Sequence, residues 1–495
     1  RPVLNAVLTN MEALSQAIVA RLADDPRLSP RPTRRGPVLK ALVEALLRTR
    51  LPFLVAGALL RPRAAADRVD QRMREVMALA DTVPGAQAAE LLDAYERSLL
   101  RGMGQLMPNA MSLAAAAMLA YGAAGRLLGP DATLDERRSL LRALPTSPTS
   151  QMNLALWALA QQAKADPASA SALRDRTAAA LAEAHHGGRL PITLQRGLDE
   201  FLARYGHRGV AEIDLGVPRW SEDPTHILLV LQNYVRPGDL EAAPDVQFSR
   251  LAGEADAMVE ELARRASRRG RVRGAATRFL LRRVRELAGY RETPKFYAVL
   301  LISRARALLL RAGGELAATG RVDRPADLFF LTLPEARAAV AGTDQRELVR
   351  RRRTEYERER RRRHVPRVLL SDGTEPRAEP AGTSGGLAGT PASAGTVSGV
   401  ARVVRSPDGA RLEPGQILVA PSTDPGWTPL FLTAGGLVME MGGMMSHGAV
   451  VAREYGIPAV VGVDGATDRI ASGSRITVDG SAGVVTLDVP LAAPD

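Results

Sequence analysis

Residues 435–463 read GGLVMEMGGMMSHGAVVAREYGIPAVVGV, and this stretch carries more information than the other regions of the chain. The apolar runs at its two ends predict buried strands, and the segment 449–454 between them predicts a short helix. Gly442 and Gly443 predict a tight turn that leaves the ring of His447 open to a reacting partner. A strand, a glycine turn, a helix and a second strand together predict an α/β domain.

His447 has no neighbour in sequence that could share a metal ion with it or complete a nucleophilic triad. A histidine that acts alone can instead be a nucleophile that carries a phosphoryl group as an N–P bond. This chemistry needs a neutral imidazole, which the ordinary pKa of about 6.5 supplies at physiological pH. We expect His447 at or near the N-terminus of a helix, where free amide N–H groups favour negative charge. The structural alternative is a histidine that only caps the helix.

Residues 442–458 resemble the phosphohistidine signature of the phosphoenolpyruvate-utilizing (PEP-utilizing) mobile domain, which occurs in pyruvate phosphate dikinase, phosphoenolpyruvate synthase and rifampin phosphotransferase. Residues 389–404 look like the opening strand region of that domain, and residues 417–431 look like its second strand and the loop facing the active histidine. The resemblance implies that His447 carries the phosphoryl group. We also expect Gly443 and Ser446 to contact that group. Dikinases usually carry threonine in place of Ser446, and the alternative for this serine is a helix cap.

The composition predicts more than one domain for a chain of 495 residues. Its large share of Ala, Leu and Arg favours helix over much of the length. The sequence has no cysteine, which excludes disulfides and thiolate metal sites and agrees with a reducing compartment. No secretory signal is visible, so we expect a cytoplasmic protein. The apolar stretch 110–128 is broken by glycines and an arginine, and we interpret it as a buried helix rather than a membrane span.

The formal net charge of +12 is concentrated in two basic tracts. Residues 346–363 contain ten arginines and four glutamates, and a second tract runs from 264 to 285. Intermixed Arg and Glu are typical of a solvated helix. Nucleic-acid binding is the alternative, but few aromatic residues interleave to stack on bases and no recognition motif is present. We therefore expect no nucleic-acid partner.

A domain boundary follows the arginine run. Residues 371–389 are rich in Gly, Pro and small residues, which predicts a flexible linker. Upstream, long apolar stretches with helical character predict a large all-α domain over residues 1–370. Downstream, short Val- and Ile-rich runs between turns predict a small swivelling α/β domain over residues 390–495. The expected strands span 416–420, 436–441, 459–463, 475–479 and 484–487.

Several segments of the helical part also carry a resemblance. Residues 201–209, 212–224, 290–296 and 323–333 look like the central helical domain of rifampin phosphotransferase and of phosphoenolpyruvate synthase-like proteins. In that family the helical domain binds the acceptor. The resemblance therefore implies an acceptor site in the helical domain, with a lipophilic molecule such as a rifamycin antibiotic as the acceptor.

Two pairs of residues in these segments are candidates for the acceptor site. Arg291 and Lys295 stand four residues apart, on one face if the segment is helical, and two converging cations would hold the transferring phosphoryl group. We expect them to be catalytic; the alternative is a solvated surface pair. His207 and Arg208 are expected to face the phosphate or the acceptor hydroxyl. Alternatively, they form a buried polar network with Glu212 and Asp214.

The resemblance implies ATP and Mg²⁺ bound by an ATP-grasp module. No ATP-grasp pattern or Walker-type glycine loop is visible in these residues, so we expect that module on a partner domain or subunit, or lost. We expect this chain itself to bind no cofactor and no metal. The sequence thus predicts the body of a dikinase-type phosphotransferase that acts on a small molecule. The alternatives are a phosphoenolpyruvate synthase-like phosphocarrier, an inactive relic, or a nucleic-acid-binding protein.

Overall fold

The computed structural model describes residues 51–78, 85–235, 243–360 and 386–487, the last with gaps at 406, 408–409, 411, 424–426 and 444–445. These residues belong to two compact units. The first unit contains the described residues among 1–57, 82–95 and 308–383. The second contains those among 58–81, 96–307 and 384–495. The expected limits at 370 and 390 rest on composition and stay a prediction, and residues 371–385 of the expected linker lie outside the described part.

The described residues before 361 are almost entirely helical, which confirms the expected all-α region. In chain order the elements are α3 (Leu51–Leu60), α4 (Pro62–Ala78), α5 (Ala88–Glu96), the π-helical η2 (Arg97–Arg101), α6 (Gly102–Leu128), η3 (Gly129–Asp131), α7 (Leu134–Ser139), α8 (Pro148–Ala165), α9 (Pro167–Asp175), α10 (Ala178–His186), α11 (Ile192–Tyr205), α12 (Thr225–Val235), α13 (Pro244–Ser267), α14 (Arg271–Leu287), η4 (Ala288–Glu292), α15 (Thr293–Ala318), η5 (Pro325–Phe330), α16 (Leu333–Val340) and α17 (Arg346–Arg360).

Short polar residues define the start of the central helices. The hydroxyl of Ser147 accepts from the backbone N–H of Ser150 at the start of α8, and Thr177 does the same for α10. Asp166 caps α9 in the same way. These caps satisfy amide groups that a helix leaves free at its first turn. Helices α8 to α12 then pack around one apolar core that includes Leu194 and Leu231.

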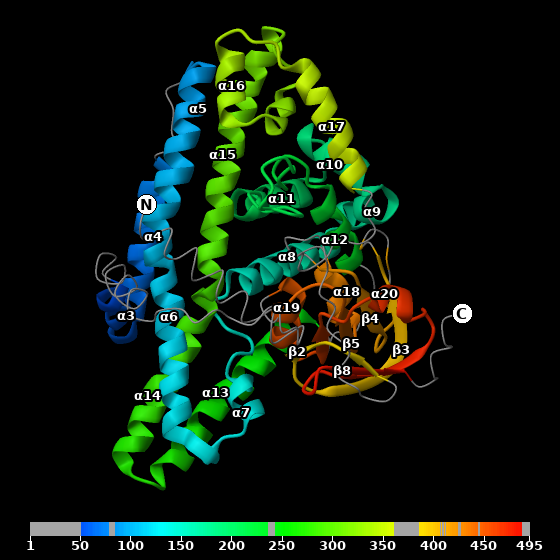
Figure 1. The fold of residues 1–495 in the computed structure, drawn as a ribbon. Helices are drawn as coiled ribbons and strands as arrows, with labels where there is room; N and C mark the ends of the chain where they lie inside the picture. The colour runs from blue at the N-terminus through cyan, green and yellow to red at the C-terminus, as the bar shows by residue number, and fades with distance from the viewer. Residues whose placement is uncertain are drawn as a thin grey trace, which may run out of the picture. The chain divides into compact units, whose positions relative to one another are not determined.

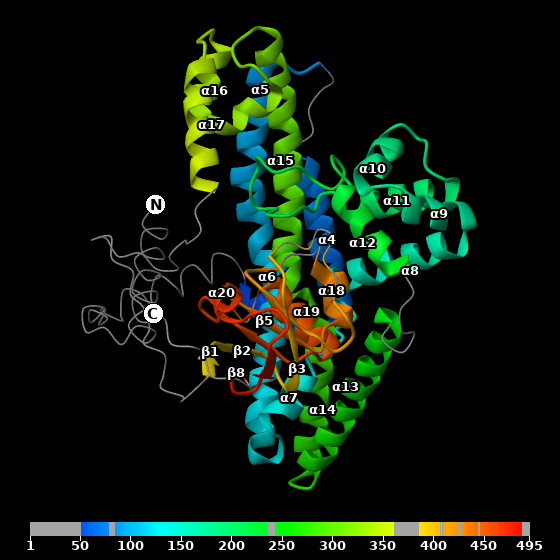
Figure 2. The same cartoon turned by 90° about the vertical axis from the view of Figure 1, so that its right-hand side faces the viewer.

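Helix α6 lies beside α14 in the second unit (Figures 1 and 2). Its small residues, such as Ala120 and Ala124, are buried, whereas Met118 and Leu119 are exposed. Within the described residues, the stretch Asn109–Asp131 is long and apolar enough to cross a membrane by length and composition. The expectation of a buried helix therefore holds for one face of α6, while side chains on its other face are exposed. The cytoplasmic location and the absence of a membrane partner stay predictions.

The arginine-rich helix α17 belongs to the first unit and buries only Val349 among its described residues, as expected for a solvated helix. Two of its arginines nevertheless have defined partners. Arg352 forms a fork with Glu335 at 2.6 and 2.9 Å, and Arg353 binds the buried carboxylate of Asp327. Part of this basic tract therefore stabilises its own unit. This agrees with a structural role for the tract, while the absence of a nucleic-acid partner stays a prediction.

The C-terminal part of the second unit is built on one mixed sheet. Its strands are β1 (Gly386–Ala388), β2 (Thr390–Ser393), β3 (Thr396–Val403), β4 (Ile417–Ala420), β5 (Gly436–Met439), β6 (Ala459–Val461), β7 (Arg475–Asp479) and β8 (Val484–Leu487), in the spatial order β1-β8-β7-β3-β4-β5-β6-β2. Strands β3 to β6 are parallel to one another, and the remaining pairs are antiparallel. The five strands expected downstream of residue 410 are all present, and the predicted α/β fold is confirmed. Strand β1 falls within the last residues of the expected linker.

Both faces of the parallel strands are buried, which explains why these strands read as continuous apolar runs. Leu418 and Leu437 pack on one face with helices α18 (Thr428–Thr433) and α19 (His447–Tyr455). Their neighbours Val419 and Val438 pack on the other face, with the short helix α20 (Ala466–Arg469). Figure 1 shows these helices against the sheet. The sheet therefore fixes the end of β5 and, through α19, the position of the first residues of that helix.

Substitution of Gly480 by alanine would test the packing of this sheet. A Cβ on Gly480 would lie 2.7 Å from the backbone nitrogen of Ala459 and would overlap the carbonyl oxygen of Ser393. Because both are backbone atoms, we predict that Gly480→Ala lowers the free energy of unfolding of this part by about 2–3 kcal/mol. Gly443→Ala is the matched control, since nothing lies within 4 Å of its added Cβ. Denaturant titration followed by circular dichroism measures both variants, and equal stabilities would contradict the prediction.

Candidate active site

His447 stands at the start of helix α19, in the loop that follows the parallel strand β5. Ser446 is the N-cap residue, with an extended backbone at φ −66° and ψ 157°. The first amide groups of a helix have no intrahelical partner and form its positive end. The carboxyl end of parallel strands, followed by a helix N-terminus, is where α/β sheets bind anions. The expected position of His447 is confirmed, and its chemical role stays a prediction.

The hydroxyl of Ser446 does not cap the helix. It makes no side-chain cap hydrogen bond, and its Oγ is buried without a hydrogen-bond partner. Gly442 beside it has a φ of +122°, and an added Cβ there would come within 2.8 Å of Ser446 Oγ. Gly442 therefore leaves room for this hydroxyl. The capping alternative for Ser446 was wrong, and its contact with a phosphoryl group stays a prediction.

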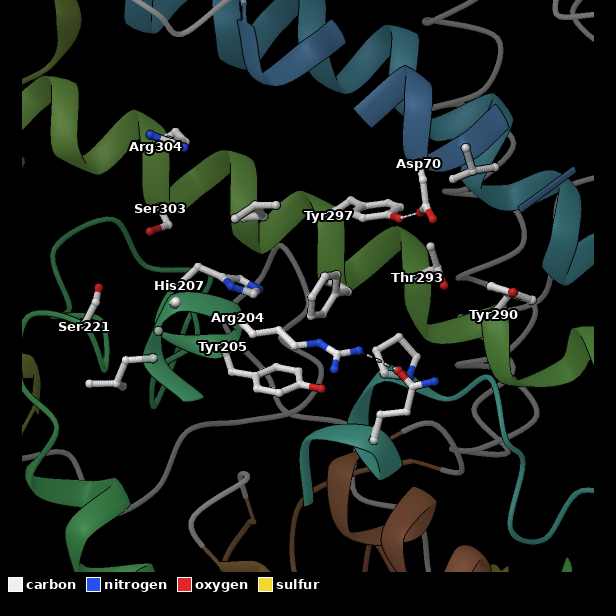
Figure 3. Close-up of a pocket in the computed structure, with 18 of the residues that line it drawn as sticks. Asp70, Arg204, Tyr205, His207, Ser221, Tyr290, Thr293, Tyr297, Ser303 and Arg304 are labelled. Carbon is white, nitrogen blue, oxygen red and sulfur yellow. Dashed lines mark hydrogen bonds between the residues drawn. The ribbon is translucent and has the colours of Figure 1, made fainter. Parts of the chain in front are cut away.

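A cavity of about 710 Å³ lies in the helical part of the second unit (Figure 3). Sites for drug-sized ligands have volumes of about 300–1,000 Å³ and combine apolar walls with a few polar groups. This cavity matches such sites in volume, but polar side chains make up a larger part of its wall. Its lining side chains include Asp70 of α4, Gln151 of α8, Arg204 and Tyr205 of α11, His207 and Ser221 of the following loop, and Tyr290, Thr293, Phe296, Tyr297, Ser303 and Arg304 of η4 and α15.

One wall of the cavity is a face of α15 that sequence reasoning missed. Tyr290, Thr293, Tyr297 and Arg304 follow a spacing of three, four and seven residues, which aligns them on one side of a helix. This stripe of polar and aromatic residues was a signal in the sequence. Tyr297 hydrogen-bonds with Asp70, and burial together with this bond raises its pKa, so it stays a neutral phenol.

His207 is the expected site residue that the structure places in the cavity wall. Its side chain is buried, and its ring meets Phe296 edge-on at 4.7 Å between centroids. Burial, followed by the positive charge of Arg208, lowers the pKa of His207 to about 4, so the ring is neutral at physiological pH. Its Nε2 atom is buried and has no hydrogen-bond partner. An unsatisfied buried polar atom costs about 1–3 kcal/mol, which a ligand could offset.

Arg208 has a different environment from its neighbour. Its guanidinium donates two hydrogen bonds to Glu212, at 2.6 and 3.0 Å, and both side chains are 5% exposed. Lys295 Nζ lies 3.0 Å from the same carboxylate. Burial alone would raise the pKa of Glu212, but the charges of Arg208 and Lys295 hold it at about 2. Arg208 therefore belongs to a buried polar network, the alternative weighed for it from sequence.

The structure does not bring Arg291 and Lys295 together in the cavity wall. Lys295 is 57% exposed and pairs with Glu212, in the first turn of α15. Arg291 is the residue before the last in the 3₁₀ turn η4, and its Nε lies 3.9 Å from Glu292 Oε1 without a hydrogen bond. Their neighbours Tyr290 and Thr293 line the cavity instead. The catalytic roles of the two cations stay predictions.

Metal binding has no visible candidate. Among the residues that the structure describes, no group of three or more His, Asp or Glu side chains is arranged to hold a metal ion. The expectation that this chain binds neither metal nor cofactor stays a prediction.

Comparison with known proteins finds matches to two regions of the chain. Residues 105–292 match the fourth domain of rifampicin phosphotransferase, and residues 412–483 match the mobile domain of PEP-utilising enzymes. The matched domains are those of a PEP-utilising phosphotransferase, and the predicted resemblance is confirmed. The first match contains most of the cavity wall, including His207, and the second contains His447.

Three relatives illustrate the similarity. Rifampicin phosphotransferase of Streptomyces sviceus is 38% identical over 296 residues, covering 59% of this chain and 34% of the relative. Rifampicin phosphotransferase of Bacillus subtilis is 33% identical over 365 residues, covering 70% of this chain and 41% of the relative. The prodigiosin synthesizing transferase PigC of Serratia marcescens is 32% identical over 305 residues, covering 59% and 33%. The chain thus spans between a third and two fifths of the length of these relatives.

The buried carboxylate of Glu212 and its basic partners allow a prediction about stability. The folded-state pKa of Glu212, about 2, lies below its ordinary value of 4.5, so the carboxylate stabilises the fold above pH 4.5 and loses that contribution as the pH falls toward 2. We predict that Glu212→Gln lowers the free energy of unfolding at neutral pH by about 3–5 kcal/mol, because Arg208 is left buried without its charge partner. The variant should also lose this part of the pH dependence.

Glu200→Gln is the matched control for this variant. Glu200 pairs with Arg196 at 3.1 Å, and both side chains are mostly exposed. Exposed pairs contribute below about 1 kcal/mol, so this variant should unfold almost like the unsubstituted protein. Urea titrations at several pH values measure both. Similar small losses in the two variants would show that the Arg208–Glu212 pair does not hold the loop.

Proposed function

We propose that the protein is a phosphotransferase in which His447 carries a phosphoryl group from ATP to a hydroxyl group of a small molecule. The observation that carries the proposal is the cavity in the helical part, because it offers a drug-sized site to an acceptor. The position of His447 at a helix N-terminus supports the carrier role, since that position stabilises the negative charge of a phosphoryl group. The family of the matched domains supports the reaction class.

The transfer step follows from the chemistry of the N–P bond. The hydroxyl oxygen of the acceptor attacks the phosphorus atom, the P–N bond to His447 breaks, and its electron pair returns to the imidazole. The hydroxyl proton leaves during the same step. The free Oγ of Ser446 and the amides of the first turn of α19 would hold the phosphoryl oxygens before transfer. Gly443, which is exposed and has open space beside its Cα, allows close approach.

Arg291 and Lys295 stay part of the proposal as cations near the entering phosphoryl group. They flank Thr293, which lines the cavity. The exposed ammonium of Lys295 is accessible to a ligand, although it also neutralises Glu212. Cations at such positions offset the charge that develops on phosphoryl oxygens during transfer.

The names of the relatives support the proposed acceptor. Two of the relatives above are rifampicin phosphotransferases, so we propose a rifamycin as acceptor. The mixture of aromatic rings and hydrogen-bonding groups in the cavity suits a large molecule that has both apolar surface and hydroxyl groups. We further propose that ATP and Mg²⁺ bind to an ATP-grasp domain or subunit and that the α/β domain swings between the two sites, which the composition of residues 371–389 favours.

The carrier role predicts the effect of one substitution. In the full-length protein with ATP labelled in its β-phosphate, His447→Ala should retain no acid-labile label and form no phosphorylated rifampicin, because the nucleophile is gone. Its thermal unfolding should match that of the unsubstituted protein. His186→Ala is the control, since His186 is an exposed residue of α10 outside the cavity. Product formed by the His447→Ala variant would refute the carrier role.

The same assay separates the alternatives. Label on the unsubstituted protein without a phosphorylated acceptor would indicate a phosphocarrier. Absence of label with the ATP-grasp part present would indicate an inactive relic.

A further inference from the structure

His207 lines the cavity, and its buried Nε2 atom has no hydrogen-bond partner. The ring hydrogen-bonds with the backbone of Arg204, and Nε2 makes no hydrogen bond, so the bonded atom is Nδ1. A backbone carbonyl can only accept, so Nδ1 carries the proton. In a neutral imidazole this leaves a lone pair on Nε2. Contact with the edge of Phe296 limits rotation of the ring.

The surroundings keep this histidine neutral while the cavity is empty. The charged groups that act on it are Arg208, Glu212 and Arg219, and burial has the largest effect. Arg204, Arg304 and Asp70 line the same cavity. The positive groups outnumber the negative ones, and they oppose protonation of the ring. A phosphoryl dianion brought into the cavity would act in the opposite direction and would raise the proton affinity of Nε2.

We infer that His207 is the base that accepts the proton of the acceptor hydroxyl during phosphoryl transfer. This inference rests on the proposed function. The hydroxyl of the acceptor donates a hydrogen bond to Nε2 and is thereby oriented for attack. As its oxygen bonds to phosphorus and the P–N bond to His447 breaks, the proton moves to Nε2. The electron pair of the broken bond stays on His447, and the imidazolium of His207 later returns its proton to solvent.

Two substitutions separate this role from a purely structural one. His207→Asn keeps an N–H near the position of Nδ1, which can still donate to the carbonyl of Arg204, but has no atom at Nε2. His207→Gln places a polar atom near Nε2 but cannot act as a base at neutral pH. If the histidine only supports the loop, the Asn variant should retain activity. If Nε2 takes the proton, both variants should be impaired. His186→Gln is the control with the same substitution at an exposed position.

The test uses the full-length protein, ATP and rifampicin as the acceptor probe. We expect both His207 variants to accept acid-labile label on His447 at the unsubstituted rate. Their kcat for rifampicin phosphorylation should fall by about a hundredfold to ten-thousandfold, with KM nearly unchanged. The unsubstituted protein should lose kcat at acidic pH as His207 is protonated, and the variants should lack this acidic limb.

Three outcomes in the His207 variants would overturn the inference, and a fourth in the unsubstituted protein would overturn it together with the proposed acceptor. A kcat near that of the unsubstituted protein in the Asn variant would reduce His207 to a structural residue. An unchanged acidic limb in the variants would assign that titration to another group. A charging rate that falls as much as the transfer rate would place the defect before transfer. If the unsubstituted protein becomes labelled but phosphorylates no rifampicin, the proposed acceptor fails, and the inference about its hydroxyl fails with it.

Discussion

The two hydrogen bonds between Arg208 and Glu212 are the interaction on which the proposed acceptor site depends. Both charged groups are buried, and each would be costly to bury without the opposite charge of the other. Their hydrogen bonds close a loop that begins directly after His207. Backbone bonds from Trp220 to Arg208 and from Ser221 to Gly206 hold the other end of the loop. These bonds fix the backbone next to His207, whose buried Nε2 atom has no hydrogen-bond partner.

The same loop is tied to α15, which supplies the opposite wall. Arg306 of α15 donates two hydrogen bonds of 2.8 Å to the carboxylate of Glu222, one from Nε and one from Nη2. Its Nη1 atom also donates to the carbonyl of Leu215. Lys295 of the same helix reaches Glu212. A charged network therefore positions two walls of a cavity that polar and aromatic side chains line. Within the described residues, some of the many basic side chains therefore stabilise the fold through ion pairs, in addition to those that keep the surface solvated.

The C-terminal fold and the place of His447 were predictable from sequence, because both depend on local patterns. Continuous apolar runs predicted strands that are buried on both faces. The glycines before His447 predicted a turn that leads into α19. The cavity was not predictable, since its wall joins α4, α8, α11 and α15 through contacts between residues far apart in the chain. Arg208 and Lys295 show the limit most clearly: their charges suggested a phosphate site, but only the fold reveals that both bind Glu212.

The account depends on a phosphoryl group that passes through a nitrogen of His447 before it reaches a hydroxyl. Phosphorus NMR of the full-length protein tests this directly, because a phosphoramidate and a phosphate ester give separate signals. After addition of ATP and Mg²⁺ we expect a protein-bound phosphoramidate signal, which should be replaced by an ester signal when rifampicin is added. An ester that forms while no phosphoramidate is ever detectable, and that forms equally well in the His447→Ala variant, would contradict the account.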